Sequence, residues 1–378
     1  MIFKCKNCDA ALRYDPASKM MVCNNCAGTF QAEEMYSVKD SDEMMDLDIY
    51  ACTTCGAELA VNNVEASTFC AYCGQPTVVF SRVSRRLKPA YIIPFQIDKD
   101  EAEMKIREKL HRGFFVPGKI KKLEVDRLCG IYVPFWLFDI YCHKKQIIRS
   151  GDDKAKYFFR EGEVRFKNIP VDASQQLINE SSQRLEPFDF SRLREFNAAY
   201  MSGFYADCYD VSYEEASKCA SSRAEELYDE EILGTVEGKH LKIYDSKSVV
   251  KELKNVYIMF PVWFLTFRYK EKPYTFLING QSGKIIGAVP VHKGKAVALF
   301  VILASVFSIL IYPFTAAGVS MFVSMEGDFS KWLLSAICSY TFIMLVYGLH
   351  LFRKITKSVA LTSAKSTSDF TRKRREVE

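Results

Sequence analysis

The chain has 378 residues with a formal net charge of +5, and 26% of its residues are charged. Its length predicts more than one domain, and its near-neutral body argues against nucleic-acid binding through bulk charge. The chain has 13 cysteines, and an odd number argues against a secreted disulfide framework. The paired spacing described below and the lack of an apolar leader argue against it as well.

Cysteines in the first part of the chain form two matched sets. Each set has two C-x-x-C pairs with fourteen residues between the inner cysteines, and the sets repeat at an offset of 47 residues. The text CDAAL in the first set matches CGAEL in the second, which indicates an internal duplication. The predicted metal ligands are Cys5, Cys8, Cys23 and Cys26 in the first set and Cys52, Cys55, Cys70 and Cys73 in the second.

The spacing of each set is typical of a zinc ribbon with one structural Zn²⁺ ion. Two residues between thiolates let a tight turn present both sulfurs to one ion, and four protein ligands leave no position open for catalysis. Gly56 and Gly74 follow their pairs in the second set, whereas Asp9 and Ala27 stand there in the first, where we expect less favourable turns. Iron in a rubredoxin-like site and uncoordinated thiols are the alternatives, and four pairs exceed what redox exchange needs.

The ribbons resemble those of transcription factor IIB and of the primosomal helicase called protein N-prime. They are expected at residues 1–36 and 50–82, with an acidic linker at 37–49. No P-loop motif follows them, which argues against a helicase.

Residues 85–290 are expected to form a cytoplasmic α+β domain with mainly antiparallel strands. Asp98 and Ser212 each stand where they would cap a helix, with an acidic residue three positions later. A β-rich segment between these helices is expected to turn as a hairpin at Glu161-Gly162.

Two segments of this domain echo each other, VPFWLF from Val133 and FPVWFL from Phe260, which is consistent with a prior duplication. Proline inside a strand predicts an edge strand or a bulge. Trp136 and Trp263 are either core residues or the lining of a ligand groove. The five histidines share no catalytic motif, so we expect no enzyme; they are His111, His143, His240, His292 and His350.

Two charge-free apolar runs at 296–314 and 332–352 are each long enough to cross a bilayer, so residues 296–352 predict a transmembrane helical hairpin. Basic residues flank both outer ends, which predicts a protein with two spans in the cell membrane and both termini cytoplasmic. The basic tail at 353–378 is expected to be cytoplasmic, where it would serve as an orientation signal and solvated end. Contact with anionic lipid headgroups is the alternative. The predicted class is an α+β multidomain membrane protein with two all-β zinc ribbons.

The chain begins with two ribbons, continues with a domain whose strands contain a proline followed by a tryptophan, and ends with the hairpin. In this order it resembles a family of bacterial zinc-ribbon membrane proteins associated with phage-shock-protein A-like and band-7-like proteins. The likeness rests on the four cysteine pairs and on YVPFW at Tyr132–Trp136. It implies a membrane-anchored adaptor that docks such cytoplasmic partners at the inner face of the membrane during envelope stress. The alternative is a membrane-tethered zinc-ribbon protein that binds nucleic acid, which the acidic linker argues against.

Overall fold

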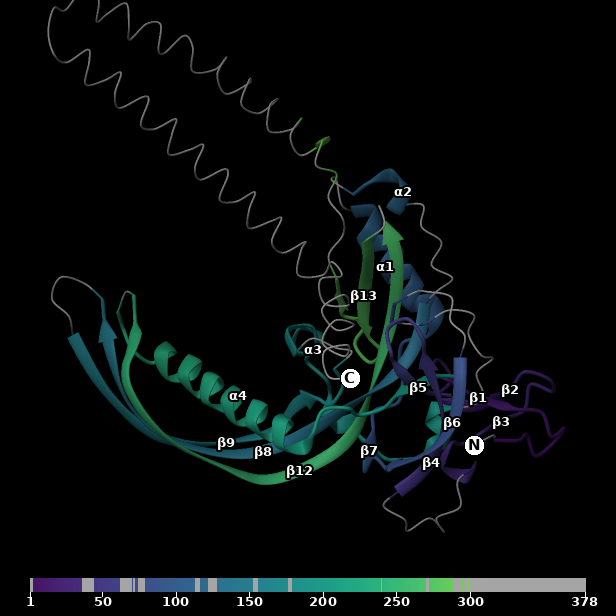
Figure 1. The fold of residues 1–378 in the computed structure, drawn as a ribbon, viewed down its shortest axis with the longest axis horizontal. Coiled ribbons are helices and arrows are strands. Elements are labelled where there is room, and N and C mark those ends of the chain that lie inside the picture. The colour runs from purple at the N-terminus through teal and green to yellow at the C-terminus, as the bar shows by residue number, and fades with distance from the viewer. Residues whose placement is uncertain are drawn as a thin grey trace, which may run out of the picture.

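The computed structural model describes most of the chain up to residue 287. The described residues are 3–35, 44–61, 70, 72–73, 79–112, 116–121, 128–151, 156–175, 179–238, 240–269 and 272–287, with four further positions between 292 and 298. Within these ranges the protein is mostly β-sheet and has four α-helices (Figure 1).

The strands are β1 (Leu12–Asp15), β2 (Met20–Cys23), β3 (Thr29–Phe30), β4 (Met44–Cys52), β5 (Glu58–Val61), β6 (Val79–Leu87), β7 (Tyr91–Ile92), β8 (Leu128–Ser150), β9 (Lys156–Asp172), β10 (Arg194–Glu195), β11 (Tyr205–Asp207), β12 (Lys242–Tyr269), β13 (Lys272–Asn279) and β14 (Ile285–Ile286). The α-helices are α1 (Lys99–Arg112), α2 (Gly118–Lys121), α3 (Asn179–Leu185) and α4 (Tyr213–Gly234). Short 3-10 helices lie at Glu33–Met35, Phe190–Arg192 and Ala198–Met201.

The strands make two sheets of very different size. The first ribbon is a three-stranded sheet of order β1-β2-β3. All other strands belong to one 11-stranded sheet of order β10-β7-β12-β8-β11-β5-β4-β6, in which β13 also pairs with β12, β14 with β13 and β9 with β8. The strands of the second ribbon, β4 and β5, are therefore part of the main sheet.

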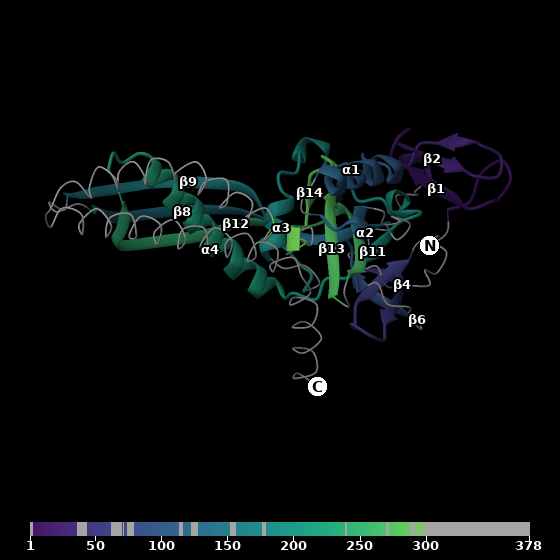
Figure 2. The ribbon, with the colours of Figure 1, turned by 90° about the horizontal axis from the view of Figure 1, so that it is seen from above.

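Three strands of the main sheet continue far beyond it as a curved arm. The arm has the order β9-β8-β12, and all its pairs are antiparallel. Helix α4 packs on β8, β9 and β12 and lies inside their curve (Figure 1). Seen from above, the arm and the first ribbon lie at opposite ends of the described structure (Figure 2).

Both predicted helix starts are confirmed. The Asp98 carboxylate accepts from the Glu101 backbone N–H at 2.7 Å, and the Ser212 hydroxyl accepts from the Glu215 N–H at 3.2 Å. The predicted hairpin at Glu161-Gly162 is wrong, because β9 runs straight through it. Gly162 serves a close approach instead, since a Cβ there would lie 3.1 Å from the Tyr228 hydroxyl of α4.

The prolines of the two echoed segments lie in central strands, so the edge-strand prediction is wrong. On one edge of β8 the pairing partner is β11 before Pro134 and β9 after it. On one edge of β12 the pairing partner is β7 before Pro261 and β13 after it. At such a point the N–H has no ladder partner, so proline removes no hydrogen bond. Both carbonyls still accept, from Ala173 N–H at 3.0 Å and Gly280 N–H at 2.9 Å.

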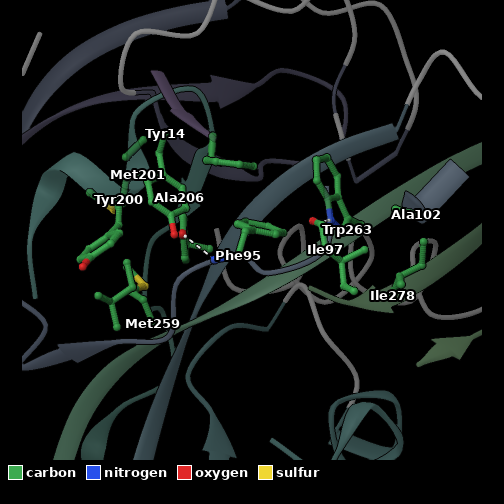
Figure 3. Packing of buried hydrophobic residues seen from close by; sticks show 14 of the residues in the cluster. Tyr14, Phe95, Ile97, Ala102, Tyr200, Met201, Ala206, Met259, Trp263 and Ile278 are labelled. Carbon is green, nitrogen blue, oxygen red and sulfur yellow. Dashed lines mark hydrogen bonds between the residues drawn. The ribbon is translucent and has the colours of Figure 1, made fainter. Parts of the chain in front are cut away.

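The core lies on both faces of β8 and β12, and both tryptophans belong to it. Trp263 is 3% exposed, and its indole N–H donates to the Ile97 carbonyl at 3.0 Å (Figure 3). Phe95 stacks on Phe204 with ring centroids 4.3 Å apart. Trp136 is also buried. The core interpretation of the tryptophans is confirmed, and the ligand-groove alternative is not.

The predicted class and location need correction. None of the helices in the described ranges has both the length and the apolar character that crossing a bilayer requires. This finding contradicts an α+β membrane protein with two spans and cytoplasmic termini, and the described chain is instead a mostly β protein. The predicted hairpin and tail lie outside the described residues, with the exception of position 298; these are the apolar runs at 296–314 and 332–352 and the tail at 353–378.

Candidate metal centres

The four cysteines of the first ribbon meet at one point. Their sulfurs all lie within 4.8 Å of one another, with Cys5 Sγ 3.5 Å from Cys26 Sγ and Cys8 Sγ 3.4 Å from Cys23 Sγ. Cys5 and Cys23 are buried, Cys8 is half-buried, and Cys26 is exposed. Hydrogen bonds from the Ala10 backbone, then Asn25 and Cys23, lower the pKa of Cys8 to about 6. This favours the thiolate that a metal ion binds.

The second ribbon gathers its four cysteines in the same way, but all four are buried. Cys52 Sγ lies 3.8 Å from Cys73 Sγ, and Cys55 Sγ lies 3.7 Å from Cys70 Sγ. Contact with the Cys55 thiol lowers the pKa of Cys52, and the same contact raises that of Cys55. Thiolates this close need a cation between them to be ionised together.

The sulfur separations fit a tetrahedral ion. A tetrahedron with metal–sulfur distances of about 2.3 Å has its sulfurs about 3.8 Å apart, and a disulfide would bring them to about 2 Å. The separations of 3.4 to 3.8 Å agree with the first geometry. The two four-cysteine clusters are therefore compatible with two metal ions, as the cysteine spacing predicts.

Matching turns present these sulfurs. The N–H groups of Asp9, Ala27 and Gly56 donate to the carbonyls of Cys5, Cys23 and Cys52 at 2.8 to 2.9 Å. The residue that closes each turn is left-handed, with φ of 59° at Asp9, 56° at Ala27 and 72° at Gly56. Only glycine adopts this conformation without steric cost, and asparagine or aspartate tolerates it better than alanine. Ala27 is therefore the strained turn.

Replacing Ala27 with glycine should stabilise the first ribbon by about 1 kcal/mol, because the left-handed conformation then costs no Cβ clash. Release of metal to a chromophoric chelator should become slower. Gly56→Ala is the matched control in the second ribbon and should have the opposite effect. Changes of the same sign in both variants would contradict this account.

The second centre is built into the main sheet through Tyr72, which stands between two of its cysteines. The Tyr72 hydroxyl donates to the Asp207 carboxylate at 2.7 Å, and its ring packs edge-on against Phe264 with centroids 5.0 Å apart. The Thr266 hydroxyl donates to the Tyr72 carbonyl at 3.1 Å. Strand β5 also pairs with β11. This second cysteine turn is thus held by two distant segments, β11 and β12.

Asp207 is the buried centre of this contact. Its carboxylate accepts from the Tyr72 and Ser174 hydroxyls at 2.7 and 2.5 Å and from the Cys208 N–H at 2.9 Å. Burial raises the pKa of Asp207 to about 7. The sequence offered one clue to this network, namely an aromatic residue between Cys70 and Cys73, but it did not indicate the partner.

The first centre is seated on the segment around η3 (Ala198–Met201). The Ser202 hydroxyl donates to the Leu12 carbonyl at 2.6 Å, and the Asn197 side-chain amide donates to the Ala32 carbonyl at 3.0 Å. The Tyr14 and Tyr200 rings meet edge-on with centroids 5.2 Å apart. The first ribbon is therefore packed against the body rather than tethered to it.

The remaining polar candidates are scattered. Within the described ranges His143 lies beside Glu161 on the arm at 3.3 Å, and His111 contacts the Arg107 carbonyl at 2.8 Å. His240 and His292 are exposed and lie in other segments, and His350 is outside the described residues. Cys129, Cys142 and Cys208 are buried and remote in sequence from both centres.

A protein of Bacillus subtilis (strain 168) described as uncharacterized protein YdjG is 30% identical to this chain over 317 residues, which cover 79% of this chain and 92% of YdjG. The chain belongs to the YdjG family. The match is several times longer than both ribbons, so the relationship to YdjG rests on the body of the protein as well as on the cysteine pairs. No protein-family model and no solved structure matches the chain.

Proposed function

We propose that this protein is a zinc-dependent adaptor that docks partner proteins and has no enzymatic activity. The observation that carries the proposal is that each centre has four cysteine ligands and therefore no open coordination position. Thiolate sets in tetrahedral arrangement suit Zn²⁺, which has no redox chemistry of its own. The chemistry available at either centre is thus structural.

Docking is supported by the position of the first ribbon. It lies at one end of the described structure (Figure 2), and its turns present exposed Lys6, Asn24 and Cys26 beside the metal centre. A metal-stiffened tip of this kind loses little conformational freedom on binding. The family resemblance supplies the candidate partners, namely phage-shock-protein A-like and band-7-like proteins.

The test is pairwise binding of the full-length protein to each purified candidate partner. The zinc-loaded protein should bind one of them saturably, and the double variant Lys6→Glu, Asn24→Lys should bind at least about tenfold more weakly. Lys119→Glu, an exposed change away from the ribbon, is the matched control. Absence of binding to both partners, or binding to a single-stranded oligonucleotide with a steep salt dependence, would overturn the proposal.

A further inference from the structure

The arm has one face that no described residue covers. Along β8 from Ile140 to Ser150, even-numbered side chains are buried under α4 and odd-numbered ones are half-buried or exposed. We call the odd-numbered side the open face. It consists of Asp139, Tyr141, His143, Lys145, Ile147 and Arg149 together with the residues paired with them in β9 and β12.

The open face carries large apolar side chains. Tyr157, Phe159 and Val249 are 56%, 61% and 51% exposed and pair with open-face positions of β8. Tyr244 is 67% exposed, and its ring meets that of Tyr157 edge-on with centroids 5.6 Å apart. Exposed apolar side chains that cluster in this way are typical of an interaction surface.

The two sides of the arm carry opposite charge. Counted by strand pairing, the open face has seven basic and four acidic side chains, with Lys247, Lys251 and Lys254 along β12. Helix α4, on the other side, has seven acidic and two basic residues. Glu226 and Glu230 of α4 are exposed to solvent.

The two sides also differ in curvature. The three strands bend so that α4 lies on the concave side and the open face is convex (Figure 1). Helix α4 fills the hollow of this curve, so the surface opposite the open face is the outer side of α4 (Figure 1).

Helix α4 is fastened so that its acidic side stays outward. Ala216, Ala220 and Ala224 are fully buried against the sheet, which allows a close approach. Farther along, Asp229 pairs with the buried Lys144 at 2.7 Å. The acidic surface is thus a fixed part of the fold rather than a segment that must be ordered on binding.

From this charge complementarity we propose that the occupant of the open face is a second copy of this chain, whose acidic α4 side packs against it. The arrangement is head-to-tail, so it can continue from copy to copy. A face of eleven residues by three strands measures about 500 Å² per copy. The total of about 1,000 Å² is at the lower limit for a specific interface, so the association is weak and concentration-dependent. It is independent of the docking function proposed above.

Sedimentation velocity of the full-length, metal-loaded protein tests this assembly. The mass should increase from low to high micromolar concentration and fall again in high salt, which screens the charges. The double variants Lys247→Glu, Lys251→Glu on the open face and Glu226→Lys, Glu230→Lys on α4 should each lower the association constant about tenfold or more. Lys19→Glu, Lys119→Glu is the charge-matched control away from the arm.

A mixture of the two arm variants distinguishes this interface from any other. The reversed open face then meets a reversed α4, so association should return in the equimolar mixture and in neither variant alone. A constant mass at all concentrations, or association that the arm variants leave unchanged, would overturn the proposal. So would an open face that binds anionic lipid vesicles or an oligonucleotide while the protein stays monomeric. Circular dichroism establishes that each variant is folded.

Discussion

Replacement of Cys70 with serine should release one metal ion and unfold the main sheet. The second centre holds β4 and β5 in that sheet, and Tyr72 beside it contacts Asp207, Thr266 and Phe264. Structural zinc contributes about 10–16 kcal/mol to folding, which is comparable to or larger than the whole stability of about 5–15 kcal/mol of a typical domain. Metal content by mass spectrometry and the β signal in circular dichroism measure the two effects.

The matched control is Cys26→Ser in the first centre. Cys26 is exposed, and its ribbon is a separate three-stranded sheet. This variant should also lose one metal ion but should keep the β signal of the main sheet. If the two variants were equally folded, the second centre would not be the one on which the main sheet depends.

Replacement of Asp207 with alanine should lower the free energy of unfolding by about 3 kcal/mol. The change removes the acceptor of two buried hydroxyls, those of Tyr72 and Ser174, and each such loss costs about 1–3 kcal/mol. Urea unfolding at constant metal concentration measures this. An effect below about 1 kcal/mol would mean that the network is not a main attachment of the second centre.

Asp207→Asn is the informative companion because it keeps an acceptor but cannot ionise. The pKa of Asp207 is raised to about 7 in the folded protein by burial. Below about pH 4, the pKa of an aspartate in the unfolded chain, the raised pKa of Asp207 contributes its full stabilisation. This contribution to the free energy of unfolding is lost as the pH rises through the folded-state pKa of about 7. From about pH 6 to about pH 8 the unsubstituted protein should lose about 1.4 kcal/mol from this group, and Asp207→Asn should lose none of it.

The metal centres could be predicted because their information is local. All eight ligands lie in two short stretches, and a C-x-x-C turn needs only its own residues to aim its sulfurs. That the turns at Asp9 and Ala27 are less favourable than glycine turns could be predicted for the same reason. The helix starts at Asp98 and Ser212 also depend on neighbouring residues alone.

What could not be predicted depends on residues that are distant in sequence. Nothing in the sequence near β5 indicates that β11 will pair with it. The sequence therefore predicts the second ribbon as a separate module rather than as part of the main sheet. Gly162 is read as a turn unless the approach of Tyr228 is known. Pro134 and Pro261 are read as edge signals unless it is known that their strands change partners there. In each case tertiary contact gave a local signal another meaning.

The pairing of β5 with β11 has a consequence for the order in which the protein is made. The cysteines of the second centre, Cys52 to Cys73, leave the ribosome early, whereas Tyr205 to Asp207 of β11 come much later. At about 5–20 residues per second, this leaves roughly ten seconds during which the metal turn can close while one sheet edge has no neighbour. During that interval the backbone N–H and C=O groups of β5 that later pair with β11 have no strand partner on that side.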